Sequence, residues 1–223
     1  MKKNLLCRAG AAFGLGAAVC GLLVFGPAGT LRYAGGWLFM GVLFCPMAAA
    51  GAWLFLKHPQ LLEKRLKAKE TRGKQGLVVK LSGLMFVLGF AAAGLDFRFG
   101  WLALPGWVPV AAAAAFLAGY GLYALVLKEN AYLSRVVEVQ EGQTVVTTGP
   151  YAFVRHPMYS ATLLMFLSMP LMLGSAVSLC FFLPYPLVIA GRIKDEEALL
   201  EEELEGYREY KQKVKYRLVP FVW

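Results

Sequence analysis

Two short polar segments of this chain carry most of the side chains that are suited to ligand binding or catalysis. The first, residues 143–159, brings tyrosine, imidazole and guanidinium groups close together. The second, residues 192–197, contains two basic and three acidic residues. An uncharged apolar stretch, residues 158–190, connects the two segments. If that stretch folds back on itself, its ends meet, and the two polar segments face each other across one pocket.

The end of the first segment is typical of a helix start. Pro157 suits the first position of a helix, where a missing N–H costs no hydrogen bond. A helix that begins there would leave the backbone N–H groups of Met158, Tyr159 and Ser160 unpaired. Free N–H donors and the helix dipole both favour negative charge. We therefore expect this helix start to attract a carboxylate group of a ligand.

The acids and aromatic rings of the two segments favour a ligand that is also cationic and flat. Glu196 and Glu197 would attract an ammonium or a sulfonium group. Tyr151 and Tyr159 offer aromatic faces to a flat ring or to a cation. S-adenosylmethionine combines a carboxylate, an ammonium, a positive sulfur and an aromatic base. The residue types therefore predict a site for this cofactor.

The same residues also allow plainer roles. Arg155 and His156 could anchor a helix end at the lipid headgroups. Glu196 and Glu197 could complement the dipole of a helix start without touching any ligand. From the residues alone, a binding site and a structural arrangement both remain open.

The composition of the chain predicts a helical membrane protein. Of its 223 residues, 58% are apolar and 17% are charged, and the mean hydropathy is +0.55. Soluble domains carry about 25% charged residues. Five stretches lack Asp, Glu, Lys and Arg, and a membrane span needs about 20 apolar residues. These stretches are residues 9–25, 34–56, 81–95, 99–127 and 158–190.

We predict an all-α, polytopic integral membrane protein with four spans, a C-terminal transmembrane helical hairpin and an amphipathic cytoplasmic tail helix. The last stretch is too long for one upright span, and Pro170 and Gly174 lie near its middle, where a helix should break. Residues 1–127 would form a four-span scaffold, and residues 128–223 the cofactor-binding catalytic region. The tail is expected to be helical from Arg192 to about Lys215.

The basic residues are distributed so as to indicate an orientation in the membrane. If the N-terminus, residues 57–76, residues 128–155 and the tail share one side, that side holds 20 of the 23 Lys and Arg residues. Lys80, one turn into the third span, can snorkel to the same side, which leaves Arg32 and Arg98 on the other. The positive-inside rule makes that side cytoplasmic, which predicts a bacterial inner-membrane protein with both termini and the active site in the cytoplasm. The net charge of +9 then faces anionic lipids, so nucleic-acid binding is not needed to explain it. A chain with two histidines has no His-rich metal site.

An ordered set of motifs in the second half of the chain resembles the isoprenylcysteine carboxyl methyltransferase family. The set is Gly149-Pro150-Tyr151-x-x-x-Arg155-His156-Pro157-x-Tyr159, an apolar hairpin, Arg192-x-x-x-Glu196-Glu197, and Gly206-Tyr207-x-x-Tyr210. It covers about residues 127–220, and the first hundred residues look like the bacterial branch of the wider group, which includes membrane phospholipid methyltransferases. Arg-His-Pro alone is a weak signal, whereas the whole set in this order is specific.

The resemblance implies a membrane methyltransferase that binds S-adenosylmethionine in a cytoplasm-facing pocket. Arg192 would bind the methyl acceptor, and Arg192, Glu196 and Glu197 would form the catalytic group. Carried over by position, the cofactor-binding residues are Gln143, Thr144, Val145, Val146, Tyr151, His156, Pro157, Met158, Tyr159 and Glu196.

The implied acceptor is a lipophilic or lipidated substrate that enters from the bilayer, such as an isoprenylcysteine-like carboxylate. A carboxylate or thiolate attacks the methyl group directly, so alignment supplies most of the rate. A phospholipid amine would instead need a proton acceptor, Glu196 or Glu197, with Arg192 at the phosphate. A membrane reductase similar to sterol reductases, or a non-catalytic scaffold, is the more distant alternative. Membrane lipids are the expected surroundings, and we expect no obligate protein partner.

Overall fold

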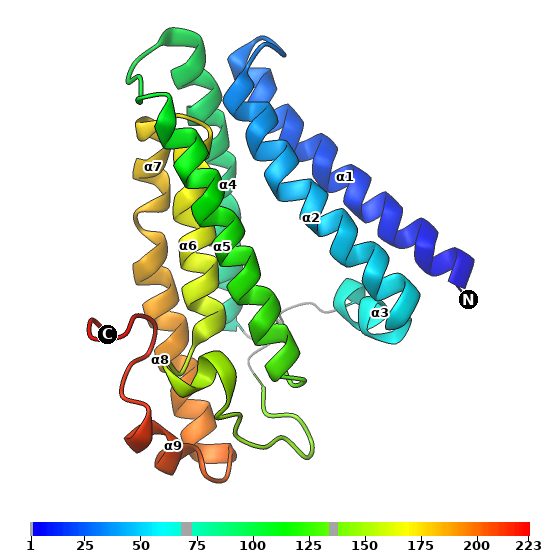
Figure 1. Cartoon of the computed structure of the whole chain (residues 1–223), viewed down its shortest axis with the longest axis vertical. Coiled ribbons are helices and arrows are strands. Elements are labelled where there is room, and N and C mark those ends of the chain that lie inside the picture. The colour runs from blue at the N-terminus through cyan, green and yellow to red at the C-terminus, as the bar shows by residue number, and fades with distance from the viewer. Residues whose placement is uncertain (1, 68–72, 134–137) are drawn as a thin grey trace. The chain divides into compact units, whose positions relative to one another are not determined.

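The computed structural model describes residues 2–67, 73–133 and 138–223, and within these ranges it is helical and contains no β-strand (Figure 1). The predicted all-α class is therefore confirmed. The elements are α1 (Lys2–Ala28), α2 (Ala34–Lys57), α3 (Pro59–Lys67), α4 (Gly73–Phe99), α5 (Trp107–Glu129), the short 3₁₀ helix η1 (Gly149–Ala152), α6 (Pro157–Met172), α7 (Ala176–Phe182), α8 (Tyr185–Glu203) and α9 (Tyr207–Lys213).

Five helical segments among the described residues are long and apolar enough to cross a membrane. The first four correspond to the four predicted spans, and the fifth is the returning leg of the predicted hairpin. The outgoing leg, α6, is apolar but has only 16 residues, fewer than the about 20 that a straight span needs. The five segments are Asn4–Ala28, Ala34–Lys57, Val79–Phe99, Trp107–Glu129 and Ala176–Glu203. Five such segments indicate an integral membrane protein.

The stretch between the second and third spans, expected to be a polar loop, contains helix α3. Pro59 occupies the first position of this helix, which suits a residue without a backbone N–H. The Leu62 N–H donates to the His58 carbonyl at 3.2 Å and closes the first turn. Residues 68–72 of the same stretch lie outside the described residues, so the expectation of a loop is not tested there.

The chain divides into two compact units, and neither is one continuous stretch of sequence. Unit 1 comprises Met1–Lys69, Gly83–Ala113 and Ser168–Phe182, and unit 2 comprises Glu70–Ser82, Ala114–Leu167 and Leu183–Trp223. In unit 1 the buried carboxylate of Asp96 is hydrogen-bonded through both oxygens. Ser175 Oγ donates to one oxygen at 2.5 Å, and the Leu102 N–H donates to the other at 2.9 Å. These bonds join the end of α4 to the turn of the hairpin.

Gly94→Ala is expected to destabilise unit 1 by about 1–3 kcal/mol, because it would overpack the contact between α1 and α4. A Cβ atom on Gly94 would lie 2.5 Å from the Val24 carbonyl oxygen and 2.9 Å from the Ala28 nitrogen, and both are backbone atoms. Gly83, on the same helix, has nothing within 4 Å of its Cβ position, so Gly83→Ala should keep or raise stability. Thermal unfolding in detergent compares the two variants. Equal melting temperatures would contradict this close helix contact.

The predicted hairpin is present, and its turn lies at residues 173–175. Gly174 has φ of +75°, a region that glycine adopts without steric cost. Pro170, expected to help break the helix, lies within the last turns of α6 instead. The returning leg is interrupted between α7 and α8, at Leu183 and Pro184.

In unit 2 the two legs of the hairpin contact each other along α6 and α8 (Figure 1). Tyr185 OH donates to Thr162 Oγ1 at 3.0 Å, and the rings of Phe166 and Tyr185 are 4.8 Å apart. Gly119 lets α5 approach α6, because a Cβ atom there would lie 2.6 Å from Met165 Cγ. The first turn of α6 lies opposite the middle of α8, where Tyr159 contacts Arg192 and Glu196.

The expectation of one tail helix that continues to Lys215 is wrong. Helix α8 ends at Glu203, and α9 is a separate helix of seven residues. Gly206 turns the chain between them with φ of +82°, a conformation that favours glycine. The apolar face predicted in this tail packs inward as a result. Its buried residues are Leu204, Tyr207 and Tyr210.

Candidate functional site

A tight turn before α6 presents the residues of the first polar segment. It consists of η1 and residues 153–156, and α6 begins at Pro157 as predicted. The C-terminal part of the chain supports this turn through the main chain. The Arg155 N–H donates to the Tyr216 carbonyl, and the His156 N–H donates to the Arg217 carbonyl, both at 2.9 Å.

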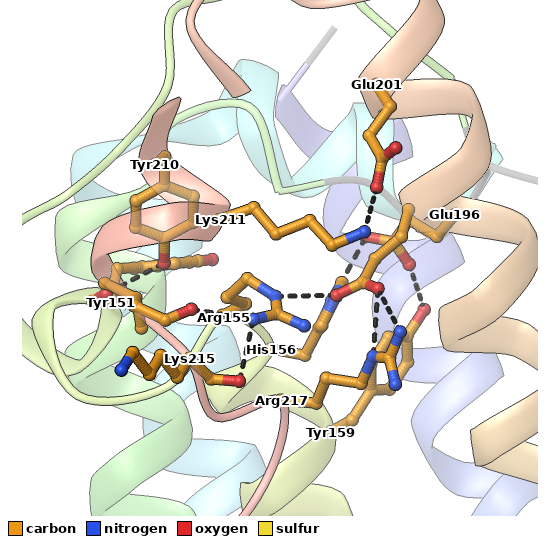
Figure 2. Close-up of polar contacts among 12 residues, drawn as sticks. Tyr151, Arg155, His156, Tyr159, Glu196, Glu201, Tyr210, Lys211, Lys215 and Arg217 are labelled. Atoms are coloured by element: carbon orange, nitrogen blue, oxygen red, sulfur yellow. Dashed lines mark hydrogen bonds and ion pairs between the residues drawn. The ribbon is translucent and has the colours of Figure 1, made fainter. Parts of the chain in front are cut away.

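Helix α8 presents Arg192 and Glu196, one helical turn apart, to the first turn of α6. The Tyr159 hydroxyl joins the two side chains. It donates to Glu196 Oε2 at 2.6 Å, and it accepts a hydrogen bond from Arg192 Nε at 2.8 Å. Figure 2 shows Tyr159 and Glu196 pointing toward each other. The two polar segments therefore meet, as a hairpin between them requires.

Glu197 contacts a different set of partners from those of its neighbour Glu196. It is 3% exposed, and its Oε1 accepts from Arg155 Nε at 2.7 Å and lies 3.2 Å from His156 Nε2. Its Oε2 accepts from Arg217 Nε at 2.9 Å and from Nη2 at 2.8 Å. Arg155, His156 and Arg217 lie close together in Figure 2. Because both of its oxygens are engaged, this geometry does not support the predicted catalytic role of Glu197.

A pocket of about 840 Å³, its open mouth included, lies in unit 2 between these elements. Pro157, which is fully buried, and Glu197 are not part of the pocket wall. The predicted site residues that do line it are Gln143, Thr144, Val145, Val146, Tyr151, His156, Met158, Tyr159, Arg192 and Glu196.

Half of the pocket wall comes from residues that were not predicted to bind a ligand. Part of this set has a signal in the sequence, because Leu200, Leu204, Tyr207 and Tyr210 recur at helical spacing. Such an amphipathic face, however, indicates packing or contact with the membrane surface rather than ligand binding. Asn130 and its neighbours follow α5 without any motif. The additional residues are Asn130, Tyr132, Leu133, Glu138, Arg155, Leu199, Leu200, Leu204, Tyr207 and Tyr210.

The start of α6 has fewer free donors than predicted. The N–H groups of Tyr159 and Ser160 donate to the His156 carbonyl at 3.0 and 3.2 Å. The prediction of three unpaired N–H groups is therefore wrong, because the tight turn supplies an acceptor for two of them. At most the Met158 N–H is left for a ligand, and the helix dipole still favours an anion there.

His156 and Glu196 place two hydrogen-bond acceptors at one end of the pocket. An ionised carboxylate only accepts hydrogen bonds, so in the neutral form of the imidazole we assign the hydrogen to Nε2, which lies 3.2 Å from Glu197 Oε1. Nδ1 is then an acceptor, and it lies 3.9 Å from Glu196 Oε1. A primary ammonium group, which has three donors, suits the space between two such acceptors.

Tyr151 provides a neutral aromatic wall on another side of the pocket. Asn130 Nδ2 donates to its hydroxyl at 2.7 Å, and Tyr210 OH donates to its carbonyl at 2.8 Å. Burial raises the pKa of Tyr151 to about 12, although the bond from Asn130 lowers it and the charge of Glu196 raises it further. The hydroxyl of Tyr207 is buried and has no hydrogen-bond partner among the described residues. Polar and aromatic groups of this pocket thus fit a charged ligand with a flat ring.

Comparisons with known proteins bear on the same part of the chain. Residues 111–202 match the model of the isoprenylcysteine carboxyl methyltransferase (ICMT) family, which confirms the resemblance inferred from the motifs. The chain is also 32% identical over 74 residues to the uncharacterized protein YpbQ of Bacillus subtilis (strain 168). That match covers 33% of this chain and 44% of YpbQ, so it spans less than half of the curated relative.

Proposed function

We propose that this chain, whose residues 111–202 match the isoprenylcysteine carboxyl methyltransferase family, transfers a methyl group from S-adenosylmethionine to a lipophilic acceptor. The family match and the apolar helices both support a membrane methyltransferase. The observation that carries the finer proposal is the contact of Tyr159 with both Arg192 and Glu196. It brings a cationic and an anionic group to one wall of the same pocket.

The pocket residues fit the proposed cofactor at both of its ends. Glu196 Oε1 and His156 Nδ1 would accept hydrogen bonds from the ammonium group. Tyr151, Val145 and Val146 would contact the adenine ring, since they form an uncharged part of the wall. When bound, S-adenosylmethionine supplies a methyl group on a positively charged sulfur.

Arg192 is the residue that we assign to the acceptor. Its guanidinium lies beside Tyr159 in the pocket wall, and guanidinium groups bind carboxylates through two parallel hydrogen bonds. The carboxylate of an isoprenylcysteine-like acceptor is already a nucleophile. The chain then needs to align it and exclude water, without a general base.

A phospholipid amine is the second candidate acceptor, because a guanidinium matches a phosphate as well as a carboxylate. In that case Glu196 is the proton acceptor, since Glu197 is occupied by two arginines and His156. A nicotinamide cofactor is less well matched. It needs phosphate-binding cations, and of the two arginines in the pocket wall described here, Arg155 is already bound to Glu197.

We also propose that the pocket faces the cytoplasm of a bacterial inner membrane. The argument is the charge distribution: apart from Arg32, Arg98 and Lys80, which lies one turn into the third span, every Lys and Arg falls in segments on one side of the proposed topology. The positive-inside rule makes that side cytoplasmic, and S-adenosylmethionine is available there. The acceptor would reach the pocket from the lipid phase.

A methyl-labelling experiment tests the proposed reaction. Membranes with and without the protein are incubated with S-adenosylmethionine that carries an isotope in the methyl group, and the lipids and lipidated proteins are extracted. We expect a labelled lipophilic product that depends on the protein. Label released as methanol by mild alkali indicates a methyl ester, and alkali-stable label indicates N-methylation. Equal labelling in both preparations would contradict the proposal.

A further inference from the structure

The segment that follows α9 pairs with the turn that carries His156. The carbonyls of residues 216 and 217 accept the N–H groups of Arg155 and His156, both at 2.9 Å. Ser160 Oγ donates to the Leu218 carbonyl at 2.6 Å. The guanidinium of Arg155 adds two bonds, to the carbonyls of Val214 at 2.7 Å and residue 215 at 2.9 Å. Residues 214–218 thus follow the turn along its length.

Arg217 connects this segment to the buried carboxylate of Glu197. Its Nε and Nη2 atoms both bind Glu197 Oε2, at 2.9 and 2.8 Å. The other oxygen of Glu197 contacts Arg155 and His156. A buried carboxylate needs compensating cations, so Arg217 holds Glu197 where it can orient the imidazole ring.

We propose that residues 214–218 are an element of the cofactor site and that Arg217 is a positioning residue. Arg217 holds Glu197, and Glu197 holds His156 with Nδ1 directed toward Glu196. This inference rests on the proposed function for the identity of the ligand. The segment lies beyond residues 111–202, where the family match ends.

Amide hydrogen exchange of the full-length chain without ligand tests the positioning directly. In Arg217→Ala we expect the N–H groups of Arg155 and His156 to exchange about tenfold faster or more, because the turn opens locally. Amides of residues 114–129 of α5, in the same unit, should change little. Arg217→Lys keeps the charge and should recover part of the protection. Lys213→Ala removes an exposed positive charge just before the segment and should match the wild type.

Ligand affinity supplies a second readout, measured calorimetrically with S-adenosylhomocysteine. Arg217→Ala should bind it about tenfold more weakly, because the acceptor pair at His156 is no longer held in place. Lys213→Ala should bind it as the wild type does. A role in stability alone would lower the melting temperature of Arg217→Ala and leave the affinity of the folded protein unchanged.

Ser160→Ala is the companion variant, since it removes the bond to the Leu218 carbonyl and alters no charge. It should accelerate exchange at residues 155 and 156 in the same direction. Exchange at the wild-type rate in both Ser160→Ala and Arg217→Ala would overturn the proposal, as would unchanged affinity in Arg217→Ala. If the wild type does not bind S-adenosylhomocysteine, the proposed function fails, and the exchange rates still decide whether residues 214–218 hold the turn.

Discussion

Arg192→Ala is expected to lower methyl transfer by about a hundredfold or more, because a misplaced acceptor loses the benefit of alignment. Its affinity for the cofactor should stay within about threefold of the wild type, since Tyr159 still donates to Glu196 without Arg192. Turnover with labelled S-adenosylmethionine and calorimetry with S-adenosylhomocysteine measure the two effects separately. The expected result is therefore a loss of turnover without a matching loss of binding.

Two further variants serve as controls for Arg192. Arg192→Lys keeps the charge but loses the two-nitrogen fork that matches a carboxylate or phosphate, so it should restore little activity. Lys194 lies on the same helix with its side chain exposed, and Lys194→Ala should retain wild-type turnover. Wild-type turnover in folded Arg192→Ala would show that Arg192 only anchors the helix, and the assignment of the acceptor site would be wrong.

Glu196→Gln, unlike Arg192→Ala, is expected to weaken cofactor binding, by about tenfold to a hundredfold. A hydrogen bond to a charged group is worth about 1.5–3 kcal/mol, and the glutamine amide replaces a carboxylate that would face an ammonium. The variant keeps an oxygen for the Tyr159 hydroxyl, so the fold should persist. Glu202→Gln removes an exposed carboxylate from the same helix and is the matched control. Equal affinities of the two variants would remove Glu196 from the cofactor site.

The hairpin and the meeting of its two polar ends could be predicted because both depend on patterns along the sequence. The uncharged stretch was too long for one span, and Gly174 supplied the turn that the structure contains. A hairpin brings the residues at its two ends together whatever the details of its packing. Tyr159, Arg192 and Glu196 therefore meet where the spacing predicted.

The different contacts of Glu196 and Glu197 could not be predicted, because the sequence alone does not distinguish two adjacent acids on one helix. Adjacent positions of a helix point about 100° apart, and only the tertiary contacts decide which of them enters a pocket. Arg217, twenty residues away, binds Glu197, so of these two adjacent acids Glu196 is the one in the pocket wall. The contacts of α9 with the pocket were missed for a similar reason. The positive φ of Gly206 turns the chain back after α8. The apolar face that one long tail helix would have carried therefore lies toward the site.

The most direct test of the central claim is calorimetric titration of the purified protein in detergent with S-adenosylhomocysteine. We predict one binding site with a dissociation constant in the micromolar range, about −8 kcal/mol, and weaker binding by Glu196→Gln than by Glu202→Gln. Absence of binding to folded protein, with a nicotinamide dinucleotide bound instead, would contradict a methyltransferase site and favour a reductase.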